Sequence, residues 1–469
     1  MRFFQLTARA LRLTFGVGVG ICLWAAPSPA ERLPVAMPEE LLPELDRLLE
    51  TALRQSPRMI TAALITEQVR ANYLVSRAVR LPAISANATY AISESKVQDT
   101  AAPRSESDGL YYSAGFSLPL FHWGALKWQT DIARLEILFQ EINTGEAFRV
   151  LAQTIRTQYL ALIYQNLLER NSRFALDQAV EFLELQEAKL ASGTLPASAI
   201  IEPRLRVQEA QLNRDAVAEN LRYAAEGLAL LCGAPPINLG DLPTEVPGQT
   251  FAAAVRGAYL TELAGQTAIE DTAELRSNEL RLRQDRLRYR IIRTNTLPKI
   301  GLSGSYGVSN INSVVGNFVA QTAVDSFSYG ASVTWSIFDG LSTRGQRLSA
   351  LAARRVNERA RDQAIERIEG RLGSLERQIA FAGTRTELAQ RRYDLARDGV
   401  RLTQQNFEAG IASRNAVNGV TNLAYQAELA LVDARRNELN LWADFVSTAG
   451  LDPVLERFPE WKNLKVNGR

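Results

Sequence analysis

The sequence is poor in the residues that enzymes and metal proteins use for chemistry. Its 469 residues include one histidine and two cysteines. The histidine, His122, stands beside Trp123 at the end of an expected strand, where a membrane-interface role is more typical than catalysis. A zinc site would need further histidines or a cysteine pair, and no glycine-rich phosphate-binding motif is present. The sequence therefore predicts a protein that is not an enzyme, with no catalytic residue, metal ligand or cofactor.

An excess of charge is also lacking, and so are long apolar runs. The 53 basic and 51 acidic residues nearly cancel, which argues against nucleic acid as a partner. After residue 30 the sequence holds no stretch of 18 apolar residues, so no membrane-spanning helix is expected.

The first thirty residues resemble an export signal. Residues 1–30 begin with three arginines, continue with an apolar stretch over 13–26 and end in small residues before Ala30. This pattern predicts a secretory signal peptide cleaved after Ala30, the alternative being an uncleaved membrane anchor. Cys22 lies inside the segment, but the residues before it do not favour a lipid anchor. Removal of the segment leaves 50 basic and 51 acidic residues. The one remaining cysteine, Cys232, is expected to be a small core residue.

The rest of the chain is built from two copies of one unit. Three landmarks recur at an offset of 216 or 217 residues: Leu81-Pro82 with Leu297-Pro298, Phe121 with Phe338, and Gly193 with Gly410. We place the first repeat at 31–233 and the second at 251–451. The connector between them, 234–250, contains four prolines, which end the preceding helix. A tail, 452–469, follows the second repeat.

Each repeat is expected to contain the same elements in the same order. A helix leads into two strands joined by a polar loop, a very long helix follows, and a glycine turn reverses the chain into a return helix. In the first repeat these are a helix over 39–79, strands over 81–90 and 110–121, a long helix over 125–190 and a return helix over 197–231. In the second they are a helix over 252–295, strands over 297–306 and 327–338, a long helix over 341–408 and a return helix over 414–448. The two polar loops cover 93–108 and 308–325.

The long helices carry the spacing of a coiled coil. Apolar residues step by three and four along Ile365, Ile368, Leu372, Leu375 and Ile379, which forms a seam for a neighbouring helix. Roughly 66 residues at 1.5 Å each make a rod of about 100 Å. Because isolated helices are marginal in water, we expect these rods to pack side by side as antiparallel coiled coils.

The four strands alternate between an apolar face and a face of small polar residues. Strands of about ten residues with such faces suit a transmembrane barrel, the alternative being a soluble sheet packed on the helices. The lipid-facing residues would be Tyr112, Phe116, Leu118, Val333, Trp335 and Ile337. Unpaired strand edges are costly in hydrocarbon, and bacterial barrels begin at about eight strands. Several copies must therefore share one barrel, and the pattern does not choose between two and three.

Taken together, these features resemble the TolC family of outer-membrane efflux proteins. The resemblance rests on the duplication, on Leu81-Pro82 and Leu297-Pro298 before the strand pairs, on the strand ends at 121–124 and 338–340, and on the turns at 191–194 and 408–413. It implies a homotrimer in the outer membrane, with a twelve-stranded barrel in lipid and a periplasmic tunnel of helices, an α-barrel. It also implies two partners, a periplasmic adaptor and an inner-membrane pump.

The resemblance gives the two glycine turns a role. They would lie at the periplasmic tip and face the adaptor, through Gly193, Thr194, Gly410, Ile411, Ala412 and Ser413. Family members often place acidic residues and leucine just after the second turn, but this chain has Ala416, Asn418 and Gly419 there. We therefore expect a constriction of neutral side chains, with Asn415 and Asn418 as candidates.

The sequence thus favours a passive exit duct for efflux or type I secretion. The alternative is a periplasmic coiled-coil adaptor or scaffold without a pore, which would usually have one helical hairpin rather than two. The substrate is left open, because drugs, metal ions, proteins and polysaccharide are all compatible with such a tunnel.

Overall fold

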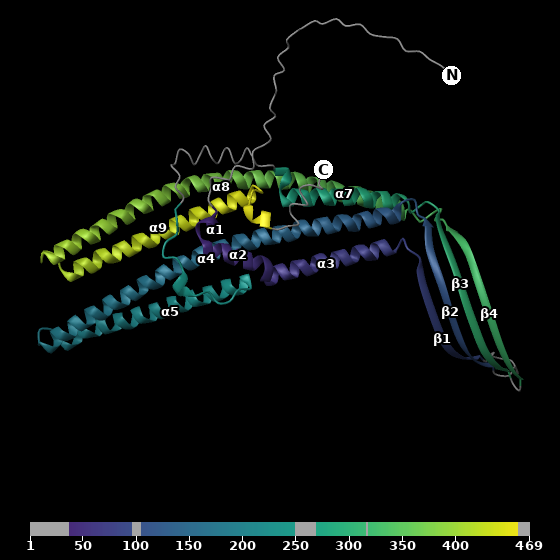
Figure 1. The fold of residues 1–469 in the computed structure, drawn as a ribbon, viewed down its shortest axis with the longest axis horizontal. Helices are drawn as coiled ribbons and strands as arrows, with labels where there is room; N and C mark the ends of the chain where they lie inside the picture. Colours follow the sequence, from purple (N-terminus) through teal and green to yellow (C-terminus); the bar gives the residue numbers. More distant parts are fainter. Residues whose placement is uncertain (1–36, 96–104, 249–268, 316–317, 458–469) are drawn as a thin grey trace, which may run out of the picture. The chain divides into compact units, whose positions relative to one another are not determined.

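A computed structural model describes residues 37–95, 105–248, 269–315 and 318–457, and Figure 1 labels its helices and strands. The expected signal peptide and Cys22 lie outside these residues. The described chain is mainly helical and contains one antiparallel sheet in the order β1-β2-β3-β4. The mainly helical α+β class predicted from the sequence is confirmed.

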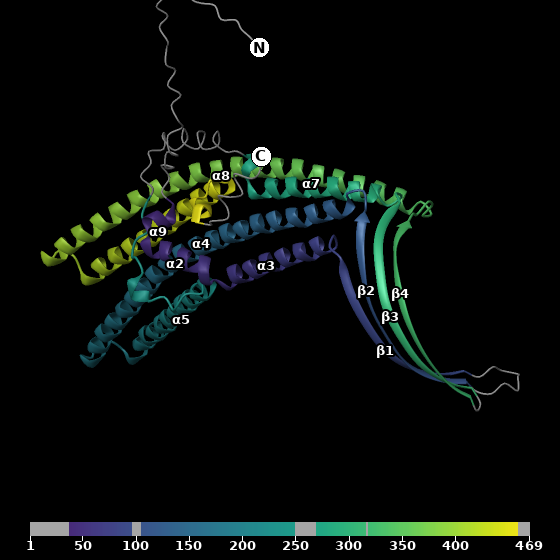
Figure 2. The same cartoon turned by 45° about the vertical axis from the view of Figure 1, so that its right-hand side comes forward.

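Each repeat supplies two strands to the sheet. The first repeat contributes β1, Ala83–Ser95, and β2, Ser105–Phe121, and the second contributes β3, Lys299–Val315, and β4, Phe318–Thr334. The repeats join where β2 pairs with β3, as in Ser117 opposite Ser303. Figure 2 shows the four strands side by side in a sheet that curves along its length.

The strands are longer than the sequence predicted. The described parts of the expected loops 93–108 and 308–325 are strand, because the pairing of β2 with β3 continues as far as Ser105 opposite Val315, while residues 96–104 lie outside the described chain. Serine and asparagine weaken the side-chain alternation there, but backbone hydrogen bonds extend the ladder regardless of side chain. The predicted end at 338 is also wrong, since β4 ends at Thr334.

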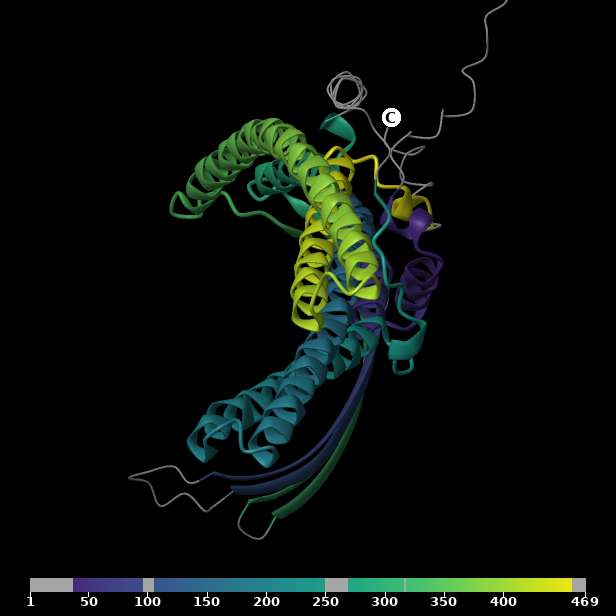
Figure 3. The same cartoon turned by 90° about the vertical axis from the view of Figure 1, so that its left-hand side faces the viewer.

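Two helices of 67 residues run through the molecule, in agreement with the prediction. They are α4, Ala125–Ala191, and α8, Ser342–Glu408. The return helices are α5, Ile201–Cys232, preceded by a short 3₁₀ turn at Ala197–Ile200, and α9, Arg414–Thr448. Figures 1 and 3 show α5 beside α4 and α9 beside α8. Within the described chain, no helix has both the length and the hydropathy needed to cross a bilayer.

The helices that precede the strands differ from the prediction. The single helix expected over 39–79 is wrong, because the chain forms α1, Pro38–Leu41, α2, Pro43–Gln55, and α3, Pro57–Ala78. Each begins with a proline, which lacks the N–H that a helix interior needs but fits a first turn. In the second repeat α7 covers Ala273–Arg293, and the earlier part of the expected helix, 252–268, lies outside the described residues.

The main core lies where both ends of the described chain meet the middle of α4. Apolar side chains from α2, α4, α5 and α9 pack there with Val454 and Leu455 of the 3₁₀ turn Pro453–Arg457. The tail expected from 452 onward therefore begins as packed structure. Arg156 of α4 is fully buried and pairs with Glu39 and Asp452, so one guanidinium holds both ends of the described chain.

Candidate functional site

The two glycine turns have nearly the same geometry. Gly193 and Gly410 adopt φ values of +74° and +72°, the left-handed conformation that glycine adopts without steric cost. The following residues close each helix end, since the N–H of Thr194 donates to the carbonyl of Lys189 at 3.0 Å and that of Ile411 to Asn406 at 2.8 Å. Because no atom lies within 4 Å of a Cβ built on either glycine, both turns are open on that side.

The remaining residues expected at the tips also lie at the turns. Ser413 caps α9, its hydroxyl accepting from the N–H of Ala416 at 3.2 Å. Ile411 is 79% exposed. Ala412, between them, is half-buried.

Of the two asparagines expected at a constriction, the structure gives a contact to one. Asn418 donates from Nδ2 to Glu181 of α4 at 3.2 Å, and Arg414 donates from Nε to the same carboxylate at 3.2 Å. Asn415 is exposed, and no hydrogen bond joins its side chain to another described residue. An acid of the first hairpin, α4 with α5, thus contacts the residues that follow the second turn.

Sequence reasoning missed Glu181 because it considered only the residues that follow the second turn. Only its distance from the first turn is readable from the sequence, and its partner is not. Glu181 precedes Gly193 by twelve residues and Asn418 follows Gly410 by eight, distances of about 18 and 12 Å along helices that run from matching turns. The two side chains meet because α4 packs against α9, which the structure shows.

The seam between the hairpins is polar and aromatic where it approaches the tips. Gln178 of α4 donates to the carbonyl of Asn418 at 3.3 Å, and Arg170 stacks on Tyr425 of α9 while pairing with Glu428. Within the second hairpin, α8 with α9, apolar contacts such as that between Ala389 and Leu431 occur together with ion pairs, as between Arg385 and Asp433.

The register of the sheet sorts the strand residues onto two faces. Phe116 lies opposite Gly304, which lies opposite Tyr329, while Leu118 lies opposite Leu302 on the same face. Tyr112 and Val333 share this face by the period of two. The other face carries mainly serine and glycine, as in Ser85, Gly115, Ser305 and Ser328. Two of the residues expected to face lipid, Trp335 and Ile337, follow the end of β4.

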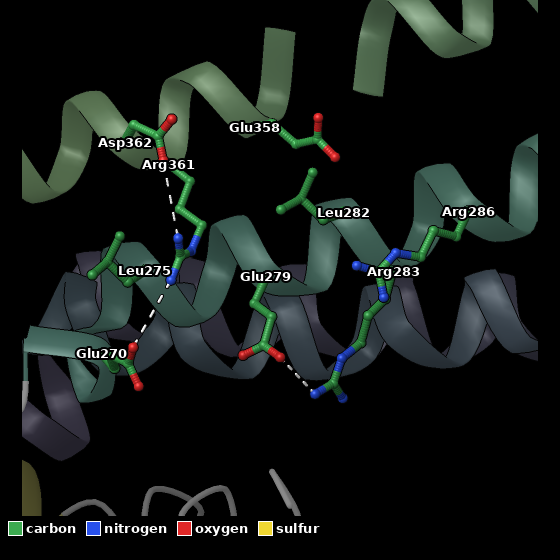
Figure 4. Close-up of a pocket in the computed structure, with 9 residues that line it drawn as sticks. All are labelled: Glu270, Leu275, Glu279, Leu282, Arg283, Arg286, Glu358, Arg361 and Asp362. Atoms are coloured by element: carbon green, nitrogen blue, oxygen red, sulfur yellow. Dashed lines mark hydrogen bonds and ion pairs between the residues drawn. The ribbon is translucent and has the colours of Figure 1, made fainter. Parts of the chain in front are cut away.

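A charged hollow of about 390 Å³ lies between α7 and α8 (Figure 4). Its charges largely satisfy one another: Arg283 pairs with Glu279, and Arg361 lies 4.0 Å from Glu270. Ligand sites are typically apolar with a few converging polar groups, which this hollow does not resemble.

Other reactive groups are isolated. Partial burial and the nearby Lys299 lower the pKa of His122, so its imidazole is neutral at neutral pH. In the described ranges no three acidic, histidine or cysteine side chains are placed to hold a metal ion.

These features define the class of protein as a transport duct, built from two strand pairs and two long helical hairpins. The chain belongs to the outer membrane efflux protein family, whose model matches residues 48–234 and 264–450. The resemblance to the TolC family is thereby confirmed. The two matches fall on the two repeats, so the family unit is the duplicated one.

Individual relatives and a solved structure agree with this assignment. The chain is 26% identical over 413 residues to outer membrane protein OprJ of Pseudomonas aeruginosa, covering 83% of this chain and 80% of the relative. It is 24% identical over 414 residues to the pyoverdine export outer membrane protein OpmQ of the same species, covering 84% and 82%. The crystal structure of the CmeC outer membrane channel of Campylobacter jejuni superposes with a TM-score of 0.64 at 13% identity, covering 98% of each chain. The chain is an outer-membrane channel component of an efflux system with a large periplasmic part.

Proposed function

We propose that three copies of this chain form a passive exit duct that is coupled through a periplasmic adaptor to an inner-membrane pump. The observation that supports the proposal is that, in the described chain, both edge strands of the sheet lack a partner on their outer side. β1 and β4 are the outer strands of the sheet and each pairs on one side only. Since unpaired strand edges are costly in lipid, further copies must cover them, and three copies supply twelve strands.

The helices have matching unfinished edges. In the tip half of the chain the helices follow the order α5, α4, α9 and α8, so α5 and α8 are the outer ones. Each presents exposed apolar side chains, and on α8 these recur every seven residues at Phe381, Leu388, Leu395 and Leu402. On α5 they are Ile201, Leu205, Leu212, Tyr223 and Leu230. Seven-residue spacing is the pattern of a coiled-coil seam, so we propose that α5 of one copy packs on α8 of the next.

Matched heights allow a direct test of this packing. Ile201 follows Gly193 by eight residues, and Leu402 precedes Gly410 by eight. With Ile201→Cys and Leu402→Cys in one chain, oxidation should give covalent dimers and trimers on a denaturing gel, and each single variant should give no trimer. A double variant that stays monomeric after oxidation in the assembled protein would refute this packing.

We propose that the apolar face of the sheet contacts lipid and the serine-glycine face lines the lumen. Tyr112, Phe116, Leu118 and Val333 then contact lipid within the strands, while Trp335 and Ile337 lie just beyond β4 at the membrane boundary. The apolar face runs along β2 from Leu120 to Leu110. At about 3.4 Å per residue and a tilt of about 40°, this is roughly 26 Å tall, which matches the apolar band of outer-membrane barrels.

The tip is proposed to be the gate and the adaptor-docking end. Glu181 holds the two hairpins together through Arg414 and Asn418. The Glu181–Arg414 pair is exposed, and such pairs are worth about 0.2–1 kcal/mol, so docking energy of ordinary size can release it. The turns at Gly193 and Gly410, with Thr194 and the exposed Ile411, would then meet the adaptor.

Channel recordings test this gate. In planar bilayers, Glu181→Ala should raise single-channel conductance or open probability, because both links to α9 are lost. Glu184→Ala is the matched control, since Glu184 is an exposed acid one turn along α4 that makes no ion pair with a described residue. Asn415→Ala should change nothing, and Asn418→Ala should have a smaller effect than Glu181→Ala. Equal conductance for Glu181→Ala and the unmodified channel would overturn the proposed gate.

The substrate is proposed to be a small molecule rather than a secreted protein. The relative named for pyoverdine export carries a small-molecule function in its name, and the toluene efflux relative of Pseudomonas putida does so too. Deletion of the gene should raise sensitivity to small toxic compounds while leaving the secreted proteins unchanged. The opposite pattern would favour type I secretion.

A further inference from the structure

The four junctions between strand and helix are strongly basic. Each carries an exposed or partly exposed lysine or arginine, within three residues of a helix end or at the first residue of a strand. These residues, which we call the junction collar, are Arg77 and Arg80 between α3 and β1, Lys127 after β2, Arg293 and Lys299 between α7 and β3, and Arg344 after β4. The only acid in the same segments is Asp339, which is engaged in capping Thr343 at the start of α8.

The collar charges are not used inside the described chain. None of the six makes an ion pair with another described residue, although such pairs are common along the helices, as between Arg371 and Asp444. No described acidic side chain therefore neutralises these six charges. The total charge of the chain nearly cancels, so the excess of positive charge is local to the junctions.

The other end of the sheet has the opposite charge. The described outer halves of the strands carry Glu94, Glu106, Asp108 and Asp325 and no lysine or arginine. Asp108 accepts from Asn312 and from Tyr90, each at 3.2 Å. The sheet is thus electrically polarised along its length, basic where it meets the helices and acidic where it ends.

A second feature marks the same junctions as a membrane boundary. Trp123 donates from its indole to the carbonyl of Pro298 at 2.7 Å, and Trp335 donates to Thr296 at 3.1 Å. Both rings are exposed while their N–H groups are fixed to backbone. An amphipathic ring held in this way suits the level of the headgroups, where tryptophan is enriched.

We propose that the junction collar binds the anionic headgroups of phospholipids in the leaflet that faces the helices. Three residues of helix rise about 5 Å, and one headgroup layer is about 5–7 Å thick, so the collar charges lie at headgroup height. Arginine pairs with phosphate through two parallel hydrogen bonds. The inference uses the outer-membrane location of the chain but not its coupling to a pump.

Tryptophan fluorescence provides a test, because Trp123, Trp128 and Trp335 lie at the collar. The purified full-length channel is reconstituted into phosphatidylcholine vesicles in which a fixed fraction of lipid carries bromine on its acyl chains, a short-range quencher. Brominated phosphatidylglycerol should compete for the protein surface about threefold better than brominated phosphatidylcholine. The preference should fall as NaCl rises from about 0.1 to about 1 M, where the Debye length shrinks from roughly 10 to 3 Å.

Matched variants separate a specific collar from general charge. Arg77→Gln, Arg80→Gln and Arg293→Gln together should clearly reduce the preference, because they remove three of the six collar charges. A control set removes three charges far along α8, at the exposed Arg391, Arg392 and Arg397, which make no ion pair with another described residue. This variant should retain the preference for phosphatidylglycerol. Replacement of the three collar arginines by lysine should retain most of the lipid preference. The same variant tests whether the channel still assembles when these positions are changed.

Three outcomes would overturn the collar. They are equal quenching by the two lipids in the unmodified protein, an undiminished preference in the collar variant, and an equal loss in the α8 control. Single-channel recordings on the same samples distinguish a failure of the lipid-binding proposal from a failure of the proposed duct. If only lipid binding fails, the channel still conducts.

Discussion

The buried guanidinium of Arg156 offers the sharpest test of how the fold is held together. Its Nε lies 2.8 Å from Glu39, and its Nη1 and Nη2 lie 2.8 and 2.9 Å from the two carboxylate oxygens of Asp452. All three side chains are less than 5% exposed. Although burial opposes its charge, Asp452 and Glu39 together raise the pKa of Arg156, so the guanidinium stays charged at any working pH.

Arg156→Met removes the cation and leaves two carboxylates buried without a partner. Removal of one member of a buried ion pair costs about 3–5 kcal/mol, which is a large part of the stability of an ordinary domain. Adding Glu39→Gln and Asp452→Asn to Arg156→Met should recover part of the lost stability.

The change in stability is measured by unfolding the detergent-solubilised channel with guanidinium chloride while its helical circular dichroism signal is monitored. Glu40→Gln is the matched control, because Glu40 is the exposed neighbour of Glu39 on the same helix and should shift stability by less than about 0.5 kcal/mol. If Arg156→Met unfolds at the same denaturant concentration as this control, the buried cluster does not hold the chain ends in the way we infer.

Two further predictions concern glycine and cysteine. Gly233 has φ +68°, and an added Cβ would lie 2.3 Å from the carbonyl oxygen of Gln55, so Gly233→Ala should cost about 2–4 kcal/mol in a denaturant melt. Gly410→Ala has the same backbone strain but open space and should cost only about 1 kcal/mol; equal losses would contradict the clash. Burial raises the pKa of Cys232 to about 11, so at about pH 8 roughly one thiol in a thousand is ionised. Maleimide should therefore label Cys232 only after unfolding, and rapid labelling of the folded protein would show that the site is open.

The sequence predicted well those features that depend on local periodicity. The alternation around Tyr112 and Phe116 placed the strands and their faces, and the heptad spacing from Ile365 to Ile379 placed α8. Both signals arise because one face of a strand or helix is buried or wetted along its whole length. The break at Pro57 was missed by the prediction of one helix over 39–79, although a proline starts a helix more readily than it continues one.

The structure alone decided which distant residues meet. The strand ladders extend beyond the reach of alternation, because backbone pairing requires only a partner strand. Glu181 faces Asn418, and Arg156 joins Glu39 to Asp452, across separations of 237, 117 and 296 residues. Charged and polar side chains carry no periodic signal that names their partner, so only the packing of the helices brings these pairs together. The sequence by itself thus determined the elements and their faces, and the tertiary structure determined the contacts that tie one repeat to the other.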